Sequence, residues 1–160
     1  MPRVISWNIR QGGGKRIEHI IGAMLAAAPD VVVVTEVRHG TNARLLRWKL
    51  EHSGLGFQCL SGERHALIVA SRVPFAQEPV PDWPADWDSR LVSMRVGGVH
   101  LLAGQFPAEA PHIERAFESL IAATGRWRLQ GVPRLLIGNL NAGANLEDTS
   151  GDLFAAGRPF

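Results

Sequence analysis

The chain has no tyrosine, a single cysteine and no long apolar run, and these absences restrict what it can be. With Cys59 alone, an intramolecular disulfide and a metal cluster of the cysteine type are both excluded, which favours a reducing, intracellular compartment. No segment approaches the roughly 20 apolar residues that span a bilayer, and the amino-terminal segment lacks the apolar core of a signal peptide. We therefore expect a cytoplasmic protein without a membrane segment.

A strong charge of either sign is also missing. The net charge of +2 is too small to indicate a nucleic-acid partner by itself. A hydrophobic share of 46% with a charged share of 20% is typical of a globular protein, and 160 residues provide a core for one domain but not for two. The sequence therefore predicts a single domain over residues 1–160.

Short apolar segments alternate with segments of helical periodicity. Strands are expected at 4–9, 31–34, 57–60, 66–71, 90–96, 99–106 and 134–139, and helices at 16–28, 41–52 and 111–127. Thr41 or Asn42 is expected to cap the second helix, and Gly97-Gly98 has the composition of a tight hairpin turn. A further helix could begin at 152–156. This order predicts a βαβ start and a mixed α/β fold with mixed sheets.

Polar side chains follow three of the apolar strands. Asn8 follows the first strand, Glu36 follows the second, and Asn139 and Asn141 follow the last. Strand ends of a buried sheet commonly build a site, because the strand fixes the backbone while the side chain reaches solvent. One carboxylate with several amides is an oxygen-rich set that suits a hard cation such as Mg²⁺, with Mn²⁺ as the alternative, and suits zinc poorly.

Five segments, in this order, carry a resemblance to a known family. They are ISWNIRQGGG at 5–14, PDVVVVTEVR at 29–38, LIVASRVP at 67–74, a hairpin that ends in Phe106-Pro107, and LLIGNLNAG at 135–143. Together they resemble the endonuclease/exonuclease/phosphatase superfamily, the group that contains DNase I and exonuclease III. The resemblance implies a four-layer α/β sandwich and a Mg²⁺-dependent phosphodiester hydrolase, acting on DNA or on another phosphodiester.

The resemblance also implies roles for particular residues. Glu36 would be the principal metal ligand, and Asn8 would lie beside the metal and the phosphate. Asn141 would position the attacked phosphate or the water, so that Asn8, Asn139 and Asn141 form the expected catalytic set. The basic residues that flank the first two motifs are expected either to contact phosphate or to be solvated surface charges; they are Arg10, Lys15, Arg38 and Arg44.

The sequence departs from the family pattern in three places. The family motif Gly-Asp-x-Asn has an aspartate where this chain has Asn139, and an amide cannot take a proton from water. Gln105 stands where the exonuclease III branch has a tyrosine, and the late Asp-His pair is missing. We therefore expect the sandwich to be incomplete, shortened at its carboxyl end. The alternative to an enzyme is an inactivated relative that binds metal and phosphate as a module or a fragment. An open sheet edge would then favour a homo-oligomer or a partner that supplies strands.

Some residues keep two interpretations at this point. The glycine loop at 11–14 is either a simple turn or a phosphate contact, and Asn139 and Asn141 are either turn residues or site residues. Trp83 and Trp87 either cover the core or stack on bases. The remaining residues singled out are expected to be structural, namely His100, His112 and the buried thiol of Cys59.

Overall fold

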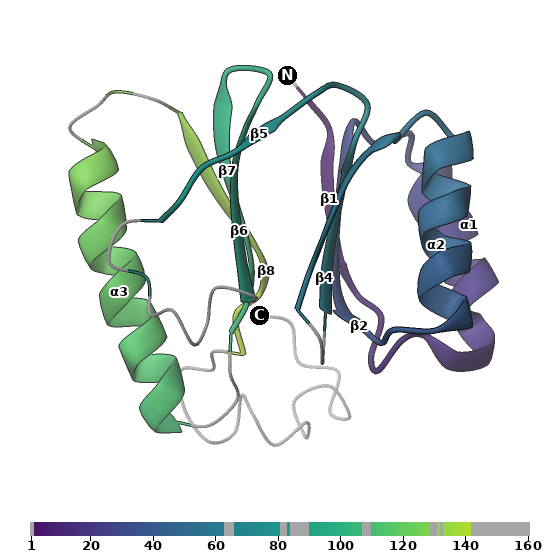
Figure 1. Cartoon of the computed structure of the whole chain (residues 1–160), viewed down its shortest axis with the longest axis horizontal. Coiled ribbons are helices and arrows are strands. Elements are labelled where there is room, and N and C mark those ends of the chain that lie inside the picture. The colour runs from purple at the N-terminus through teal and green to yellow at the C-terminus, as the bar shows by residue number, and fades with distance from the viewer. Residues whose placement is uncertain are drawn as a thin grey trace, which may run out of the picture.

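A computed structural model describes residues 2–62, 66–80, 83, 90–106, 110–128, 131 and 133–141 of the chain. Two four-stranded sheets lie face to face, and helices cover the outer face of each, so that the layers run helix, sheet, sheet, helix (Figure 1). The expected four-layer α/β sandwich is confirmed.

Each sheet contains one parallel pair of strands at an edge. The first sheet has the order β1 (Val4–Asn8), β2 (Val31–Val37), β4 (Ala66–Ser71) and β3 (Phe57–Ser61). The second has the order β5 (Ala76–Gln77), β6 (Leu91–Val96), β7 (Val99–Gln105) and β8 (Arg134–Asn139). β1 is parallel to β2 and β8 is parallel to β7, whereas the other pairs are antiparallel. The prediction of mixed sheets is therefore confirmed.

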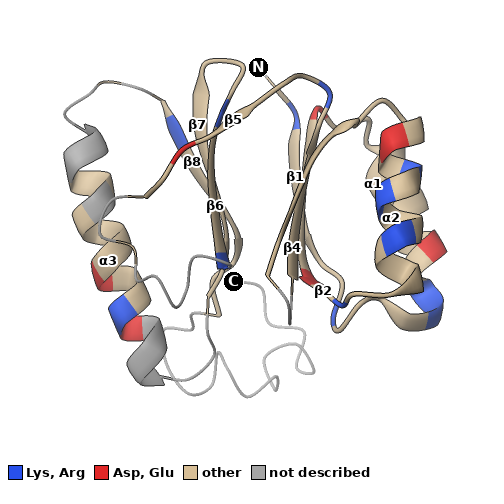
Figure 2. Ribbon diagram, in the orientation of Figure 1, with Lys and Arg blue, Asp and Glu red and all other residues tan. Residues whose placement is uncertain are grey.

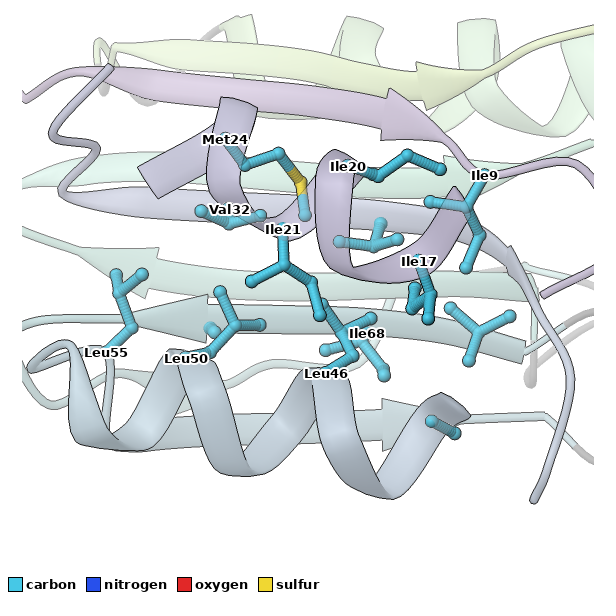
Figure 3. Close-up of a cluster of buried hydrophobic side chains, with 14 of the residues drawn as sticks. Ile9, Ile17, Ile20, Ile21, Met24, Val32, Leu46, Leu50, Leu55 and Ile68 are labelled. Carbon is cyan, nitrogen blue, oxygen red and sulfur yellow. The ribbon is translucent and has the colours of Figure 1, made fainter. Parts of the chain in front are cut away.

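The helices pack through apolar faces of helical spacing. A short 3-10 turn, η1 (Gly14–Arg16), precedes α1 (Ile17–Ala26), and α2 (Thr41–His52) follows β2. Figure 3 shows side chains of α1 and α2 meeting those of the first sheet; among them Ile20, Met24, Leu46 and Leu50 are buried. On the other side of the sandwich, α3 (Ala110–Arg128) covers the second sheet (Figure 1).

The layer between the two sheets changes from apolar to polar along its length. Val31, Val33, Leu101 and Ala103 belong to one buried cluster there, together with residues of β4 and β6. Because side chains of a strand alternate between its two faces, the next inward positions are Thr35 on β2 and Gln105 on β7, with Asn8 and Asn139 on the neighbouring strands. Asn8 is in register with Thr35 and Gln105 with Asn139. At this end, the layer between the sheets therefore consists of polar side chains.

Local structure differs from the prediction at the start of α2. The helix is preceded by Gly40 and has no side-chain cap, so the expectation that Thr41 or Asn42 caps it is wrong. The Asn42 amide instead donates to the carbonyls of Gly12 and Gly14 at 3.0 and 2.9 Å. The predicted hairpin at Gly97-Gly98 is confirmed, and both glycines have the positive φ (54° and 80°) that such a turn requires. β5 and η1 were not predicted.

Charged residues lie on the helices and toward strand ends, while most of each strand is uncharged (Figure 2). In the part of the chain that the structure describes, no helix combines the length and the apolar character needed to cross a bilayer. The predicted helix at 152–156, Trp87, Pro107 and the side chain of His112 lie outside the described residues.

Candidate active site

The polar strand ends meet at the carboxylate of Glu36. Oε1 of Glu36 accepts hydrogen bonds from Nδ2 of Asn8 at 2.6 Å and from Nδ2 of Asn139 at 3.2 Å, and Oε2 accepts one from the backbone N–H of Gln11 at 3.2 Å. Asn8 belongs to the first sheet and Asn139 to the second, so the contacts join the two sheets. The predicted convergence of three strand ends is therefore present.

Both asparagine side chains are oriented by backbone groups. Oδ1 of Asn8 accepts from the N–H of Arg10 at 2.8 Å, and Oδ1 of Asn139 accepts from the N–H of Asn141 at 3.2 Å. Because each amide oxygen is bonded to the backbone, each NH₂ group faces Glu36. Glu36 is thus surrounded by neutral donors.

The backbone of Glu36 has an unusual conformation. Its φ of 57° lies in the left-handed region, and the pairing of β2 with β4 is irregular between Val34 and Val37. The N–H of Glu36 donates to Oε1 of Gln105 at 2.7 Å, and its carbonyl accepts from the N–H of Gly12 at 2.8 Å. The side chain leaves the strand at this irregularity and is only partly buried.

The end of β8 is fixed by a close approach of two strands. Gly138 is paired in register with Gly104, and a Cβ added at Gly138 would overlap the Gly104 carbonyl. The glycine of the LLIGN segment is therefore required by packing. Beyond it, Nδ2 of Asn141 donates to the carbonyl of Phe106 at 2.6 Å, and Asn141 itself has a φ of 47°. Asn141 thus sits in a fixed turn next to Asn139.

The glycine loop lies against the same carboxylate. Gly12 and Gly13 are buried, and a Cβ at Gly12 would come within 3.2 Å of Cβ of Arg38. The contacts with Asn42 and Glu36 described above hold this loop in place. A phosphate in the loop remains a prediction.

Of the predicted phosphate contacts, Arg38 lies against this loop. Arg10, Lys15, Arg38 and Arg44 are exposed, and Nη2 of Arg38 donates to Oε1 of Gln11 at 2.8 Å. Among the described residues, no cationic side chain forms an ion pair with Glu36.

The other residues singled out by sequence lie away from Glu36. Trp83 packs against the cluster that includes Phe106, at 5.9 Å between ring centroids. His100 is buried and its Nε2 lies 2.8 Å from Oγ of Ser93; burial lowers the pKa of the imidazole. Cys59 is half-buried in the layer between the sheets, where burial raises the pKa of its thiol.

The donor set fits one weakly liganded hard cation better than a multi-ligand metal cluster. In the described part of the chain, no three or more His, Cys, Asp or Glu side chains are grouped so that they could hold a metal ion. The negative charge of Glu36 has no cationic partner there, and the buried hydroxyl of Thr35 beside it has no hydrogen-bond partner. Mg²⁺ keeps several waters and takes one or two carboxylates, so a single carboxylate such as that of Glu36 is compatible with its needs.

Sequence reasoning missed the supporting residues of the site. Gln11, Thr35 and Gln105 had no assigned role, although Gln105 was recognised as a departure from the family pattern. Alternation along the strand could have identified Thr35 and Gln105. Each faces the same inner side of its strand as residues that are otherwise apolar.

Comparison with known proteins agrees with this fold. A sequence model described as the endonuclease/exonuclease/phosphatase family matches residues 5–159. No curated protein sequence matches the chain. Among solved structures, an AP endonuclease from Archaeoglobus fulgidus superposes with a TM-score of 0.67 at 14% identity, over 91% of this chain and 60% of that one. The 3′ phosphatase NExo from Neisseria, bound to a product DNA hairpin, gives 0.69 at 19% identity, over 92% and 61%.

The fold also matches an enzyme named for a different substrate. Sphingomyelinase C from Streptomyces griseocarneus superposes with a TM-score of 0.59 at 19% identity, over 96% of this chain and 68% of that one. The chain spans about 60% of the length of the first two structures. Because the family model matches nearly the whole sequence and the fold agrees with these structures, the chain belongs to the endonuclease/exonuclease/phosphatase family.

Proposed function

We propose that the chain is a Mg²⁺-dependent phosphodiester hydrolase that acts on DNA, with Mn²⁺ as an alternative ion. The observation that carries this proposal is the Glu36 carboxylate, which is held at converging strand ends by neutral N–H donors and has no cationic partner among the described residues. A carboxylate that is fixed in place but not neutralised is a suitable anchor for a hard cation.

In this proposal the chain supplies positioning. A bound Mg²⁺ would neutralise charge on the phosphate oxygens. Glu36 would hold the ion, while Asn8 fixes the carboxylate through its NH₂ group. Asn141, anchored to the Phe106 carbonyl, would orient the phosphate or the attacking water. The exposed cations at 10, 15 and 38 would contact phosphate oxygens of the substrate backbone.

Asn139 favours a second candidate function, the binding of metal and phosphate without turnover. The family motif has an aspartate there, whereas the amide of Asn139 cannot act as a base. Its NH₂ group lies 3.2 Å from Glu36 Oε1, so it satisfies the carboxylate where a second carboxylate would repel it. The Glu36 carboxylate is thus hydrogen-bonded by position 139 without a base there.

The choice of DNA rests on relatives and is open to test. The AP endonuclease and NExo structures support a DNA substrate, and the sphingomyelinase C structure supports a lipid phosphodiester as the alternative. Parallel assays on plasmid DNA and on sphingomyelin vesicles separate the two.

The decisive experiment measures the nicking of supercoiled plasmid with Mg²⁺ and with EDTA, for the unmodified chain, for Asn139→Asp and for Glu36→Gln. Cleavage by the unmodified chain that requires Mg²⁺ and Glu36 supports the hydrolase. Cleavage by Asn139→Asp alone assigns the missing base to position 139 and supports the binding function for this sequence. Cleavage that persists in Glu36→Gln contradicts both.

The edges of the sandwich support a proposal about assembly. In the described chain β1 pairs only with β2 and β8 only with β7, and these two edge strands carry the exposed residues Trp7 and Leu135, each 38% exposed. Open edges favour pairing with another strand. A second copy or a strand-supplying partner would cover them, and a monodisperse monomer in sedimentation at micromolar concentration would contradict self-association.

A further inference from the structure

Glu36 adopts a backbone conformation that its own residue type does not favour. Its φ of 57° is accessible to glycine without strain but not to a residue with a Cβ. Its neighbours in β2 are β-branched residues, Thr35 and Val37, which favour extended backbone. The conformation must therefore be held by contacts outside the strand.

Two such contacts hold the backbone of Glu36. Glu36 lies at the irregularity of the β2–β4 pairing between Val34 and Val37, and its N–H donates to Oε1 of Gln105 at 2.7 Å. On the other side, its carbonyl accepts from the N–H of Gly12 at 2.8 Å. The first contact joins residues 69 apart in sequence and crosses from the second sheet to the first.

The position of Gln105 suits this role. Its side chain is 5% exposed and lies at the polar end of the layer between the sheets, where β7 otherwise contributes Leu101 and Ala103. A buried amide in an apolar layer is unfavourable unless it is hydrogen-bonded, so its retention calls for a specific partner. That partner is the backbone of the residue that presents the carboxylate.

We propose that Gln105 is a positioning residue for Glu36: it fixes the left-handed Glu36 peptide and thereby directs the carboxylate toward Asn8 and Asn139. The part of this inference that concerns cation binding rests on the proposed function. Residues that orient a metal ligand without touching the metal typically change metal affinity by roughly 10- to 100-fold when they are removed, and we expect an effect in this range.

The test compares two glutamine substitutions in the full chain. Gln105→Met keeps the length of the side chain but replaces the amide with a thioether, which is at most a weak acceptor. Gln58→Met is the matched control: Gln58 is partly buried, and it donates to the carbonyls of Arg47 and Leu55, away from Glu36. If Gln105→Met does not fold, Gln105→Asn is used in its place, because its shorter side chain no longer reaches the Glu36 N–H.

Two quantities are measured: the hydrogen-exchange rate of the Glu36 amide by NMR, and the Mn²⁺ dissociation constant by electron spin resonance of the free ion. We expect Gln105→Met to accelerate exchange at Glu36 and to weaken Mn²⁺ binding by roughly 10- to 100-fold, while Gln58→Met changes neither. The proposal is overturned if Gln105→Met leaves both the exchange rate and the Mn²⁺ dissociation constant unchanged, or if it accelerates exchange without weakening Mn²⁺ binding. It is also overturned if Gln58→Met has equal effects.

Failure of the proposed function gives a different result. If the unmodified chain binds no Mn²⁺, the metal-dependent hydrolase is contradicted, and exchange at the Glu36 amide then decides alone whether Gln105 holds this residue. Faster exchange in Gln105→Met supports the positioning role, and unchanged exchange overturns it.

Discussion

Two carboxylates in this molecule are held in opposite ways. Glu78 forms an ion pair with Arg95, at 3.1 Å between Oε1 and Nε. Its other oxygen, Oε2, lies 3.6 Å from Nε2 of His100. Within the described part of the chain, Glu36 has only the neutral donors of Asn8, Asn139 and the Gln11 backbone. The protein thus compensates the charge of Glu78 and leaves that of Glu36, which is the electrostatic condition for attracting a cation from solution.

The largest expected difference between the two carboxylates is in metal binding. Glu36→Gln should weaken Mn²⁺ binding more than about 100-fold and remove any Mg²⁺-dependent hydrolysis, because the loss of several kcal/mol of charge stabilisation corresponds to about a thousandfold in rate. Glu78→Gln should change both by less than about twofold. Isothermal titration and plasmid nicking measure the two effects, and equal losses in both variants would remove the distinction.

A second prediction concerns the neutral donor at position 139. Asn139→Asp places a second carboxylate beside Glu36 and removes a hydrogen bond to a charged group, so stability in EDTA should fall by about 2 kcal/mol. Mg²⁺ should restore it, because a ligand at 100 times its dissociation constant adds about 2.7 kcal/mol. Urea unfolding with EDTA and with Mg²⁺ tests this.

The matched control for this variant is Asn141→Asp. Asn141 donates to the Phe106 carbonyl and its side chain does not contact Glu36 in the described structure. Asn141→Asp should lose a comparable hydrogen bond and therefore a comparable amount of stability. Mg²⁺, however, should stabilise this variant no more than it stabilises the unmodified chain. An equal Mg²⁺ response in both variants would contradict the role of like charge at Glu36.

The sequence predicted the place of the site better than its internal contacts. Strand patterns correctly brought Asn8, Glu36 and Asn139 together, because apolar runs mark strands and polar residues mark their ends. The left-handed backbone of Glu36 carries no local signal, since the irregularity arises from pairing with β4. Its contact with Gln105 depends on how two sheets stack, which periodicity within one strand does not reveal.

The error at α2 has a similar cause. Asn42 at the start of a helix is locally a good cap, yet in the structure its amide bonds the loop carbonyls of Gly12 and Gly14. A tertiary contact with a segment 28 to 30 residues away therefore replaced the local one. The fold was predictable because its elements are strongly patterned, whereas side-chain partners at the site are chosen by tertiary packing.

A smaller expected effect is the pH dependence near Glu78. Burial lowers the pKa of His100, which Glu78 partly opposes. The unfolded chain then binds the proton more readily than the folded one, so stability is complete above about pH 6.5 and falls as the pH decreases toward the folded pKa. His100→Gln should flatten this loss in urea unfolding between pH 7.5 and 5. If His100→Gln loses as much stability between pH 7.5 and 5 as the unmodified chain, groups other than His100 cause the loss.

The smallest effect should come from the ion pair itself. Arg95 is 51% exposed in its side chain, so Arg95→Gln should cost only about 0.2–1 kcal/mol, and less at high salt. The two ends of the pair nevertheless act oppositely on His100: Glu78 raises its pKa and Arg95 lowers it. An NMR titration should therefore show a lower pKa of His100 in Glu78→Gln and a higher one in Arg95→Gln. If the pKa of His100 shifts in the same direction in both variants, breaking the pair changes the packing around His100. The contrast between a compensated and an uncompensated carboxylate would then lose its electrostatic basis.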